Sequence, residues 1–351
     1  MNKNPAQNRP LSGWIILDKP RGLGSTQAVG AVKRNLREGG FAKTKVGHGG
    51  TLDPLAEGVL PIALGEATKL AGRMLDASKV YEFTIQFGEE TSTLDTEGEV
   101  VETSNHRPRM AAIPAVLKHF TGPIEQVPPA YSALKVDGKR AYDLARAGEA
   151  VELKTRAVEI YSLDILPGTG RGTSEAGGEA RSGNSGGDDW NKPVVSPPNP
   201  ADGPPACIGE GLAETVTLTA HVSKGTYIRS LARDIARALG TVGHVTYLRR
   251  TKAGPFTGTQ AISLDSLNEI GKGAGLQDRI LPLDAGLDDI PALSLDPDSA
   301  QAARQGRIIS GLPQPDGLYC ATQNNVPVAL MEIVDGSAKV VRGFNLSDAA
   351  E

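Results

Sequence analysis

A histidine and an aspartate lie five positions apart in the glycine-rich run Gly47-His48-Gly49-Gly50-Thr51-Leu52-Asp53-Pro54. Glycines let the backbone approach a ligand closely and adopt positive φ angles. Pro54 restricts the conformation of Asp53 and removes one amide donor. We therefore expect an irregular loop, neither helix nor strand, that positions the Asp53 carboxylate for chemistry.

Asp53 also has a simpler interpretation, because an aspartate before proline in a glycine-rich turn often only caps that turn with its own side chain. For His48, a structural role is the commoner one, and the five dispersed histidines include no pair at metal-ligand spacing. Taken alone, the run leaves three alternatives: a turn cap, a catalytic carboxylate, and a metal-dependent hydrolase that uses both side chains.

Further segments accompany this run along the chain. They are residues 17–25 (LDKPRGLGS), 55–69 (LAEGVLPIALGEATK), 128–142 (PPAYSALKVDGKRAY), 225–229 (GTYIR) and 247–250 (YLRR). Together with the run they resemble, in the same order, the motifs of the TruB family of tRNA pseudouridine synthases. The resemblance extends over residues 11–166 and 212–290 and is weaker in the C-terminal section.

The resemblance implies an isomerase that converts uridine 55 of the tRNA T arm to pseudouridine after flipping the base out of its loop. The reaction breaks the N1–C1′ bond, turns the uracil and rejoins it through C5, with neither a metal nor a cofactor. The essential aspartate of the family matches Asp53, as nucleophile. Three routes stay open: addition to the base, addition to the sugar, and loss of the C2′ proton of the sugar. Each needs an ionised carboxylate.

Two more residues match catalytic positions of the family. Arg229 matches an arginine whose charge accompanies the aspartate, although alone it also suits the start of a solvated arginine stripe. Tyr81 matches a tyrosine that stacks on the target base and acts as a base in proton transfer. Tyr81 also shares one strand face with Phe83, Ile85 and Phe87, which alternate with polar residues, so a core aromatic is the alternative.

The remaining matches are residues that the resemblance places against RNA. They are Tyr227 and Leu248, which line the uracil pocket, and His48, which fills the gap left by flipped nucleotides. Without the resemblance, Tyr227 and Leu248 would be interpreted as core residues. We also expect Lys19 and Lys69 to meet phosphate or the Asp53 loop. The chain departs from the family pattern at Gly49, where a threonine is common, and at Gly24, where threonine or serine is usual.

Alternation and amphipathic spacing predict the elements that position these residues. Strands are expected at 11–19, 80–88, 158–166, 214–222 and 245–248, and helices at 26–37 (capped by Ser25), 67–77, 108–120, 142–147 and 230–239. Strand-like segments at 317–322, 326–333 and 338–342 indicate a small β-rich C-terminal module. The predicted fold is α/β (α+β), with a mixed, largely antiparallel sheet in a pseudouridine synthase catalytic domain and a module that resembles the PUA RNA-binding domain.

The chain is expected to divide into a disordered N-terminus at 1–10, a catalytic domain at 11–290 and the PUA-like module at 291–351. Within the catalytic domain, residues 167–211 contain 11 glycines, 7 prolines and 4 serines among 45 residues. Such a composition buries too little apolar surface to offset the entropy of ordering. It therefore predicts a flexible surface insertion.

The composition limits the class of protein. With 351 residues, 39% hydrophobic and 22% charged, the chain is typical of a globular protein of about two domains. Two cysteines, Cys207 and Cys320, are too few for a disulfide framework or a multi-cysteine zinc site. No run approaches the roughly 20 apolar residues of a membrane span, and residues 1–5 lack the apolar region of a signal peptide, so we expect neither. We expect a cytoplasmic monomer.

Positive charge is concentrated in one part of the chain, although the net charge is −4. Residues 224–252 hold seven basic residues and one acidic residue, whereas 263–300 hold eight acidic and two basic residues. Counterion release depends on the contacting residues alone, so a localised basic face suits phosphate binding. We expect a face that grips the T arm of tRNA, made by Arg233, Arg237, Arg249, Arg250 and Lys252; an ordinary solvated face is the alternative.

A protein that binds or folds tRNA without catalysis is a rival to the enzyme. The intact set of Asp53, Tyr81 and Arg229 argues against it.

Overall fold

The computed structural model describes residues 11–132, 134–136, 138–147, 153–167, 172–173, 211–271 and 274–346. The predicted disorder of 1–10 and most of the predicted insertion at 167–211 lie outside these residues and stay predictions. None of the described helices is long and apolar enough to cross a membrane.

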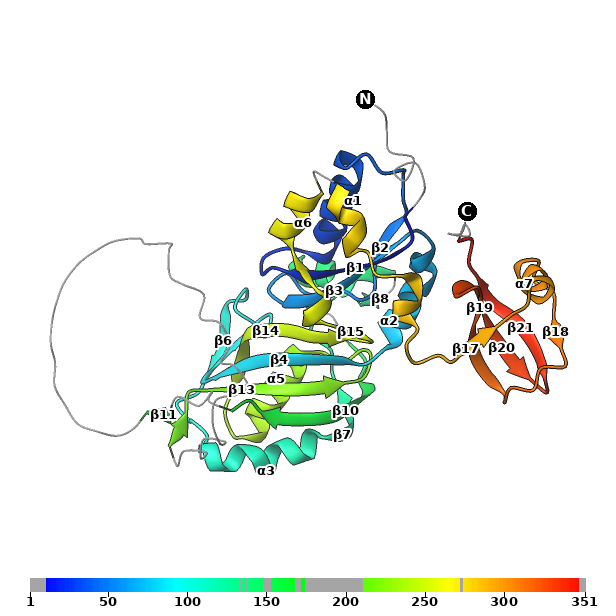
Figure 1. Ribbon diagram of the computed structural model, residues 1–351. Coiled ribbons are helices and arrows are strands. Elements are labelled where there is room, and N and C mark those ends of the chain that lie inside the picture. The colour runs from blue at the N-terminus through cyan, green and yellow to red at the C-terminus, as the bar shows by residue number, and fades with distance from the viewer. Residues whose placement is uncertain are drawn as a thin grey trace.

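A large mixed sheet forms the centre of the main body (Figure 1). In spatial order its strands are β16 (Ile262–Ser263), β1 (Gly13–Lys19), β3 (Glu57–Leu64), β14 (Gly243–Ala253), β4 (Lys79–Phe87), β13 (Thr215–Val222), β10 (Arg156–Ile165) and β7 (Gly122–Gln126), with β15 (Phe256–Thr257) on β14 and β2 (Val46–His48) on β3. The β1–β16 and β3–β14 pairs are parallel and the others antiparallel. The predicted mixed, largely antiparallel sheet is confirmed.

Short helices cover this sheet, and they follow the amphipathic spacing of the sequence. They are α1 (Ser25–Glu38), α2 (Ala71–Asp76), α3 (Ile113–Leu117), α4 (Ala141–Arg146), α5 (Ile228–Ala238) and α6 (Leu264–Ile270), with the 3-10 helices η2 (Gly65–Leu70), η3 (Met110–Ala112), η4 (Lys118–Phe120), η5 (Gly258–Gln260), η6 (Ala274–Arg279) and η7 (Leu283–Gly286). Paired short strands lie beside them: β5 (Glu89–Thr91) with β6 (Val100–Thr103), β8 (Lys135–Val136) with β9 (Lys139–Arg140), and β11 (Gly172–Thr173) with β12 (Leu212–Ala213).

Two hydrophobic cores meet on the sheet. One joins α3 and α5 to β4, β13 and β10, and the other joins α1 and α6 to β1 and β3. Phe83, Ile85 and Phe87, which alternate along β4, are fully buried in the first core. Tyr81 and Leu248 are half-buried and contact both cores. The junction of the cores therefore exposes these two side chains.

The C-terminal β-rich module is confirmed as a separate sheet with its own core (Figure 1). Its strands run in the order β17 (Ala292–Ser294), β19 (Gly317–Gln323), β20 (Val326–Val334), β21 (Ser337–Gly343) and β18 (Ile309–Ser310), beside α7 (Pro297–Arg304). Another apolar cluster, which includes Trp14, Cys320 and Phe344, joins this module to the main body.

Some predicted elements differ from the structure. The strand expected at 245–248 is the longer β14, because Arg250 is buried within it although its charge interrupts the apolar pattern. The helix expected at 67–77 is η2 followed by α2, and that at 108–120 is divided among η3, α3 and η4. Ser25 lies in the first turn of α1 instead of capping it, because its hydroxyl bonds to Leu52.

Candidate active site

A cavity of about 310 Å³ opens where the two cores meet. Four segments supply most of its walls: the run that contains Asp53, the start of β4, the segment that leads into α5, and the middle of β14. Leu75 of α2 and Leu134 complete them. The predicted site residues that line it are Asp53, Tyr81, Tyr227, Arg229 and Leu248. The structure thus brings together side chains that are up to 195 positions apart in the chain, from Asp53 to Leu248.

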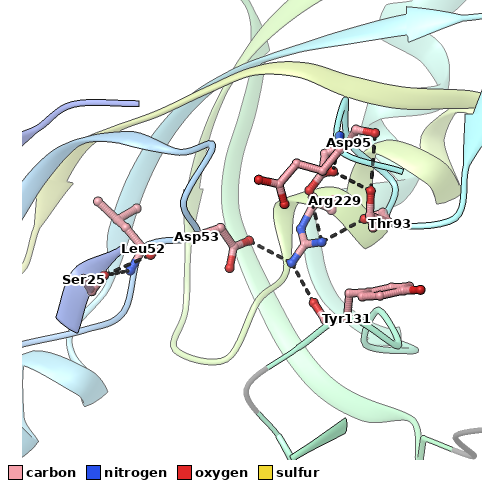
Figure 2. A network of polar contacts seen from close by, with 8 residues as sticks. Ser25, Leu52, Asp53, Thr93, Asp95, Tyr131 and Arg229 are labelled. Atoms are coloured by element: carbon pink, nitrogen blue, oxygen red, sulfur yellow. Dashed lines mark hydrogen bonds and ion pairs between the residues drawn. The ribbon is translucent and has the colours of Figure 1, made fainter. Parts of the chain in front are cut away.

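Asp53 and Arg229 form an ion pair across this cavity (Figure 2). The Arg229 Nη2 to Asp53 Oδ2 distance is 2.8 Å. The arginine side chain is 6% exposed and the aspartate side chain 40% exposed. Arginine keeps its charge in proteins, so the pair holds the carboxylate in one orientation while leaving it open to a ligand.

Arg229 is itself fixed by partners that the sequence did not indicate. Its guanidinium donates to the backbone oxygens of Thr93 (2.8 Å) and Tyr131 (2.9 Å) and lies 3.2 Å from Asp95 Oδ2. Figure 2 shows these groups around the guanidinium. The signal that could have found them is the cluster of short polar residues in 91–96, which lies between two strands.

Asp95 is a buried carboxylate with its own support. The Glu97 amide donates to Asp95 Oδ1 (3.0 Å), and the Thr93 hydroxyl donates to the same oxygen. Leu94, between them, has a φ of 62° and is 6% exposed, so the turn adopts a left-handed conformation that is costly for leucine. The turn therefore places a second carboxylate against Arg229.

The Asp53 segment is held by buried polar side chains bound to its backbone. The Ser25 hydroxyl accepts from the Leu52 amide (2.8 Å) and donates to the Leu52 carbonyl (2.9 Å). Lys19 donates to the carbonyls of Pro54 (3.2 Å), Leu23 and Pro20. Of the two alternatives for Lys19, the structure shows contact with the Asp53 loop; the residue is fully buried, and burial lowers its pKa to about 8.

Arg250 holds the same segment from β14. Its Nε donates to the Val59 carbonyl (2.8 Å), and its Nη atoms donate to the carbonyls of Gly50 (3.1 Å) and Thr51 (3.4 Å). The residue is 1% exposed. Its predicted place on a basic RNA-binding face is therefore wrong, because its guanidinium bonds to the backbone inside the protein.

The glycine-rich run is only partly irregular. Val46–His48 forms β2, which pairs with β3, so the expectation of a loop is wrong for Gly47 and His48 and holds from Gly49 onward. A Cβ atom at Gly49 would lie 2.6 Å from Met74 Cβ. A threonine at this position would clash with Met74, so glycine here allows α2 to pack closely on the loop.

His48 does not line the cavity around Asp53. Its Nδ1 is buried and has no hydrogen-bond partner among the described residues. Burial, and then the charge of Arg250, lower the pKa of His48. Across the described ranges, no three histidine, cysteine, aspartate or glutamate side chains are grouped so that they could hold a metal ion.

Tyr227 is fixed at the cavity wall by its backbone. The Gln126 side chain accepts from the Tyr227 amide (2.8 Å) and donates to its carbonyl (3.1 Å). Burial raises the pKa of the Tyr227 phenol. Tyr81 and Leu248 lie on the neighbouring strands β4 and β14, so three of the predicted substrate contacts lie around one space.

Lys69 does not line this cavity. Its Nζ lies 2.6 Å from Glu66 Oε2 and donates to the Gly343 carbonyl (2.9 Å) at the end of β21. The Asn345 amide also donates to Glu66 (2.7 Å). Contact of Lys69 with the Asp53 loop is therefore wrong, and its contact with phosphate stays a prediction. The residue bridges the main body to the C-terminal module.

The expected basic face is largely neutralised by carboxylates. Its ion pairs are Arg233–Asp234 (2.8 Å), Arg237–Glu90 (2.9 Å), Arg249–Asp18 (2.9 Å) and Arg249–Glu57 (3.2 Å), while Lys252 is exposed. The excess of basic residues in 224–252 is thus balanced by acids that are distant in the sequence. A strongly positive surface does not follow from that excess.

Family models match the chain in two places. Residues 38–175 match the N-terminal domain of the TruB family pseudouridylate synthases, and 229–288 match the tRNA pseudouridylate synthase B C-terminal domain. The first match contains Asp53, Tyr81 and Asp95, and the second contains Arg229 and Leu248. The two segments that meet at the cavity thus belong to models of one family.

Curated relatives match nearly the whole chain. The tRNA pseudouridine synthase B of Novosphingobium aromaticivorans is 60% identical over 97% of this chain and 100% of its own length. That of Zymomonas mobilis is 50% identical over 98% of this chain and 100% of its own.

Solved structures share the fold. A Cbf5-Nop10-Gar1 complex contains a chain with a TM-score of 0.61 and 24% identity, over 99% of this chain and 90% of the other. An H/ACA RNP bound to a substrate RNA containing 2′-deoxyuridine gives a TM-score of 0.61 and 23% identity, over 96% and 86%.

Proposed function

The chain belongs to the TruB family of pseudouridylate synthases, isomerases that act on tRNA, and we propose that it converts uridine 55 of the T arm to pseudouridine with Asp53 as the catalytic carboxylate. The ion pair between Asp53 and the buried Arg229, at a cavity of about 310 Å³, is the observation that carries this proposal.

The target nucleotide leaves its stack and enters the cavity. Extrusion costs a few kcal/mol, which stacking and polar contacts in the pocket offset. Tyr81 supplies the stacking face, and Tyr227 and Leu248 enclose the base from the α5 and β14 sides. A cavity of about 310 Å³ is at the small end of ligand pockets, which suits a single nucleotide.

Asp53 acts on the sugar or the base at the point where the glycosidic bond breaks. Arg229 keeps the carboxylate oriented, and its contacts with the Thr93 and Tyr131 carbonyls keep the guanidinium from turning away. The reaction exchanges the N1–C1′ bond for a C5–C1′ bond, moves a proton from C5 and returns one to N1. Tyr81 stacks on the base and takes part in that proton transfer, and the three routes for the carboxylate stay open.

The test compares the wild type with Asp53→Asn on a T-arm hairpin transcript, with pseudouridine mapped at each uridine. The variant is expected to lose at least ~1000-fold in rate, because it removes the reactive charge and keeps the shape. Asp164→Asn, at an exposed aspartate of β10, is the matched control and should keep full activity. Unchanged yield in Asp53→Asn would support the rival, a non-catalytic tRNA-binding protein.

We also propose that residues 11–290 form the catalytic domain and that 291–351 form a PUA-like module that contacts the same tRNA. The module's separate core supports this division. The proposed protein is a cytoplasmic monomer, as its low cysteine content favours a reducing compartment. Light scattering of the protein with and without tRNA tests the monomer, and loss of pseudouridine confined to position 55 in cells without the protein tests the site.

A further inference from the structure

Lys79 lies in the wall of the cavity and has no part in the proposed reaction. It is the first residue of β4 and is 7% exposed. Because side chains alternate along a strand, Lys79 and Tyr81 project from the same face of β4, about 7 Å apart along it. Both line the cavity.

The Lys79 ammonium retains capacity to bind a further group. It donates to the carbonyls of Leu75 (2.6 Å) and Ala77 (2.6 Å), at the end of α2. A lysine ammonium carries three N–H donors, so these two bonds leave one. The nearby Asp76 is 2.9 Å from Lys224, and no ion pair joins Lys79 to a carboxylate within the described part of the chain.

The other cations of the cavity wall differ from Lys79. Arg229 is paired with Asp53 and Asp95. Arg250 uses each of its three nitrogens on the backbone around the Asp53 loop. Lys79 therefore combines a largely buried charge, no carboxylate partner and an unassigned donor, and such a charge is costly until an anion compensates it.

We propose that Lys79 binds a phosphodiester oxygen of the extruded target nucleotide, an inference that rests on the proposed function. Lys79 and Tyr81 line the cavity from one face of β4, so a nucleotide with its base on Tyr81 and its sugar at Asp53 brings its own phosphate towards Lys79. A uracil carbonyl would leave the lysine charge uncompensated, whereas a phosphodiester is an anion. Leu75, 51% exposed at the same rim, packs against the sugar.

Burial also lowers the pKa of Lys79 to about 8, with the charges of Arg250 and Lys224 acting in the same direction and Asp76 opposing them. The Lys79 ammonium therefore titrates in a pH range in which RNA binding can be measured. An adjacent phosphate favours the protonated form. RNA binding at pH 8.5 is thus expected to take up protons in the wild type and fewer in Lys79→Met.

Binding of a T-arm hairpin in an Asp53→Asn background tests the contact, because no product forms. The RNA carries a neutral methylphosphonate at the phosphate on one side or the other of the target uridine. Lys79→Met is expected to weaken binding ~10-fold and to lower the slope of log K against log salt by ~0.7 to 0.9, the loss of one phosphate contact. One of the two methylphosphonates should weaken the Lys79 protein ~10-fold and leave Lys79→Met unchanged.

The control is Lys118→Met, which removes an exposed lysine of η4 outside the cavity and should change neither slope nor affinity. Lys79→Arg should retain most of the slope. If Lys79 only caps α2, Lys79→Met should lower the melting temperature of the protein, and each methylphosphonate should weaken RNA binding equally in the wild type and in Lys79→Met. That result would overturn the proposed phosphate contact. Failure of wild-type protein to form pseudouridine in the unmodified hairpin would instead overturn the proposed function.

Discussion

The two sides of the cavity hold their buried cations in different ways. On the side of the Asp53 loop, Lys19 and Arg250 bind backbone carbonyls. On the opposite side, Arg229 binds two carboxylates as well as two carbonyls. All three residues are at most 6% exposed. The first arrangement fixes the path of a chain segment, whereas the second fixes one reactive group.

This difference separates residues that shape the site from residues that act in it. Carbonyl oxygens satisfy the donors of a buried cation without forming an ion pair with it, so the bonds of Lys19 and Arg250 position backbone and not a carboxylate. Arg229 instead joins two carboxylates, Asp53 of the loop and the buried Asp95, so its charge acts directly on the reactive group. Substitutions of Lys19 or Arg250 should therefore mainly lower stability, whereas substitution of Arg229 should lower both stability and catalytic rate.

The largest expected effect follows from Arg229→Met. Removing the guanidinium leaves the buried Asp95 carboxylate unpaired, which costs about 3–5 kcal/mol in the free energy of unfolding. It also frees Asp53 to reorient, with an expected loss of ~100- to 1000-fold in kcat/KM. Urea unfolding and single-turnover pseudouridine formation measure the two losses separately.

The double variant Arg229→Met/Asp95→Asn sharpens this test. It removes the uncompensated buried charge, so part of the lost stability should return, and the two changes should not add. Activity should stay low because Asp53 still lacks its partner. Recovery of activity together with stability would show that Arg229 serves the fold and not the carboxylate.

Arg250→Met tests the loop side and comes next in size. Three bonds from a charged donor to buried carbonyls are lost, with an expected cost of about 2–4 kcal/mol in the free energy of unfolding. Hydrogen exchange should become faster at the amides of 49–59, because the Arg250 side chain no longer bonds to the carbonyls of this segment.

The neighbouring Arg249→Met is the matched control. Arg249 is 28% exposed and makes two ion pairs near the surface, so its loss should cost about 0.5–1 kcal/mol. Equal losses at the two positions would contradict the distinction between a buried cation bound to carbonyls and a surface ion pair.

The sequence predicted the reactive groups better than the groups that support them. Asp53, Tyr81, Tyr227, Arg229 and Leu248 were identified through the family motifs, and the structure places all of them at one cavity. Asp95 was missed because a single acid in a polar turn has no periodicity and no motif of its own. Its importance depends on a partner 134 positions away, Arg229, which only the folded chain brings near.

Charge was the least predictable property. The basic excess of 224–252 suggested a positive face, but Arg233 pairs with its neighbour and Arg237 with Glu90 of β5. Arg250 lies inside the protein, since β14 is central in the sheet and its residues reach the backbone of the strand beside it. Local counts of charge do not include partners from other elements, so they overestimate surface potential.

Measuring the free energy of unfolding against pH tests the burial of Lys19 beside the Asp53 loop without a substitution at that position. Burial lowers the pKa of Lys19 from 10.5 to about 8, so between these values the unfolded chain binds more protons than the native one. The free energy of unfolding therefore gains a positive contribution from Lys19 as pH rises through 8. Compared with Lys19→Met, the wild type should gain about 1–2 kcal/mol between pH 7.5 and 9.5 in urea unfolding.

The comparison with Lys19→Met is needed because burial also lowers the pKa of Lys79. Lys79 is present in both proteins, so its contribution cancels in the difference between them. A difference between the two proteins that falls as pH rises would reverse the sign expected for a buried ammonium. It would mean that the bonds to Pro54 and Leu23 stabilise the charged form more than burial disfavours it.

The smallest loss of stability is expected for Lys69, whose bond to a backbone carbonyl is accessible to water. Lys69 donates to the Gly343 carbonyl as Lys19 does to Pro54, but its side chain is 30% exposed and pairs with Glu66. Water can replace both partners, so Lys69→Met should cost only about 0.5–1 kcal/mol. The apolar cluster of Trp14, Leu330 and Phe344 still fastens the C-terminal module, and KM for tRNA should change less than 2-fold by steady-state kinetics. A loss as large as that of Arg250→Met would show that bond type, and not burial, decides the strength of these contacts.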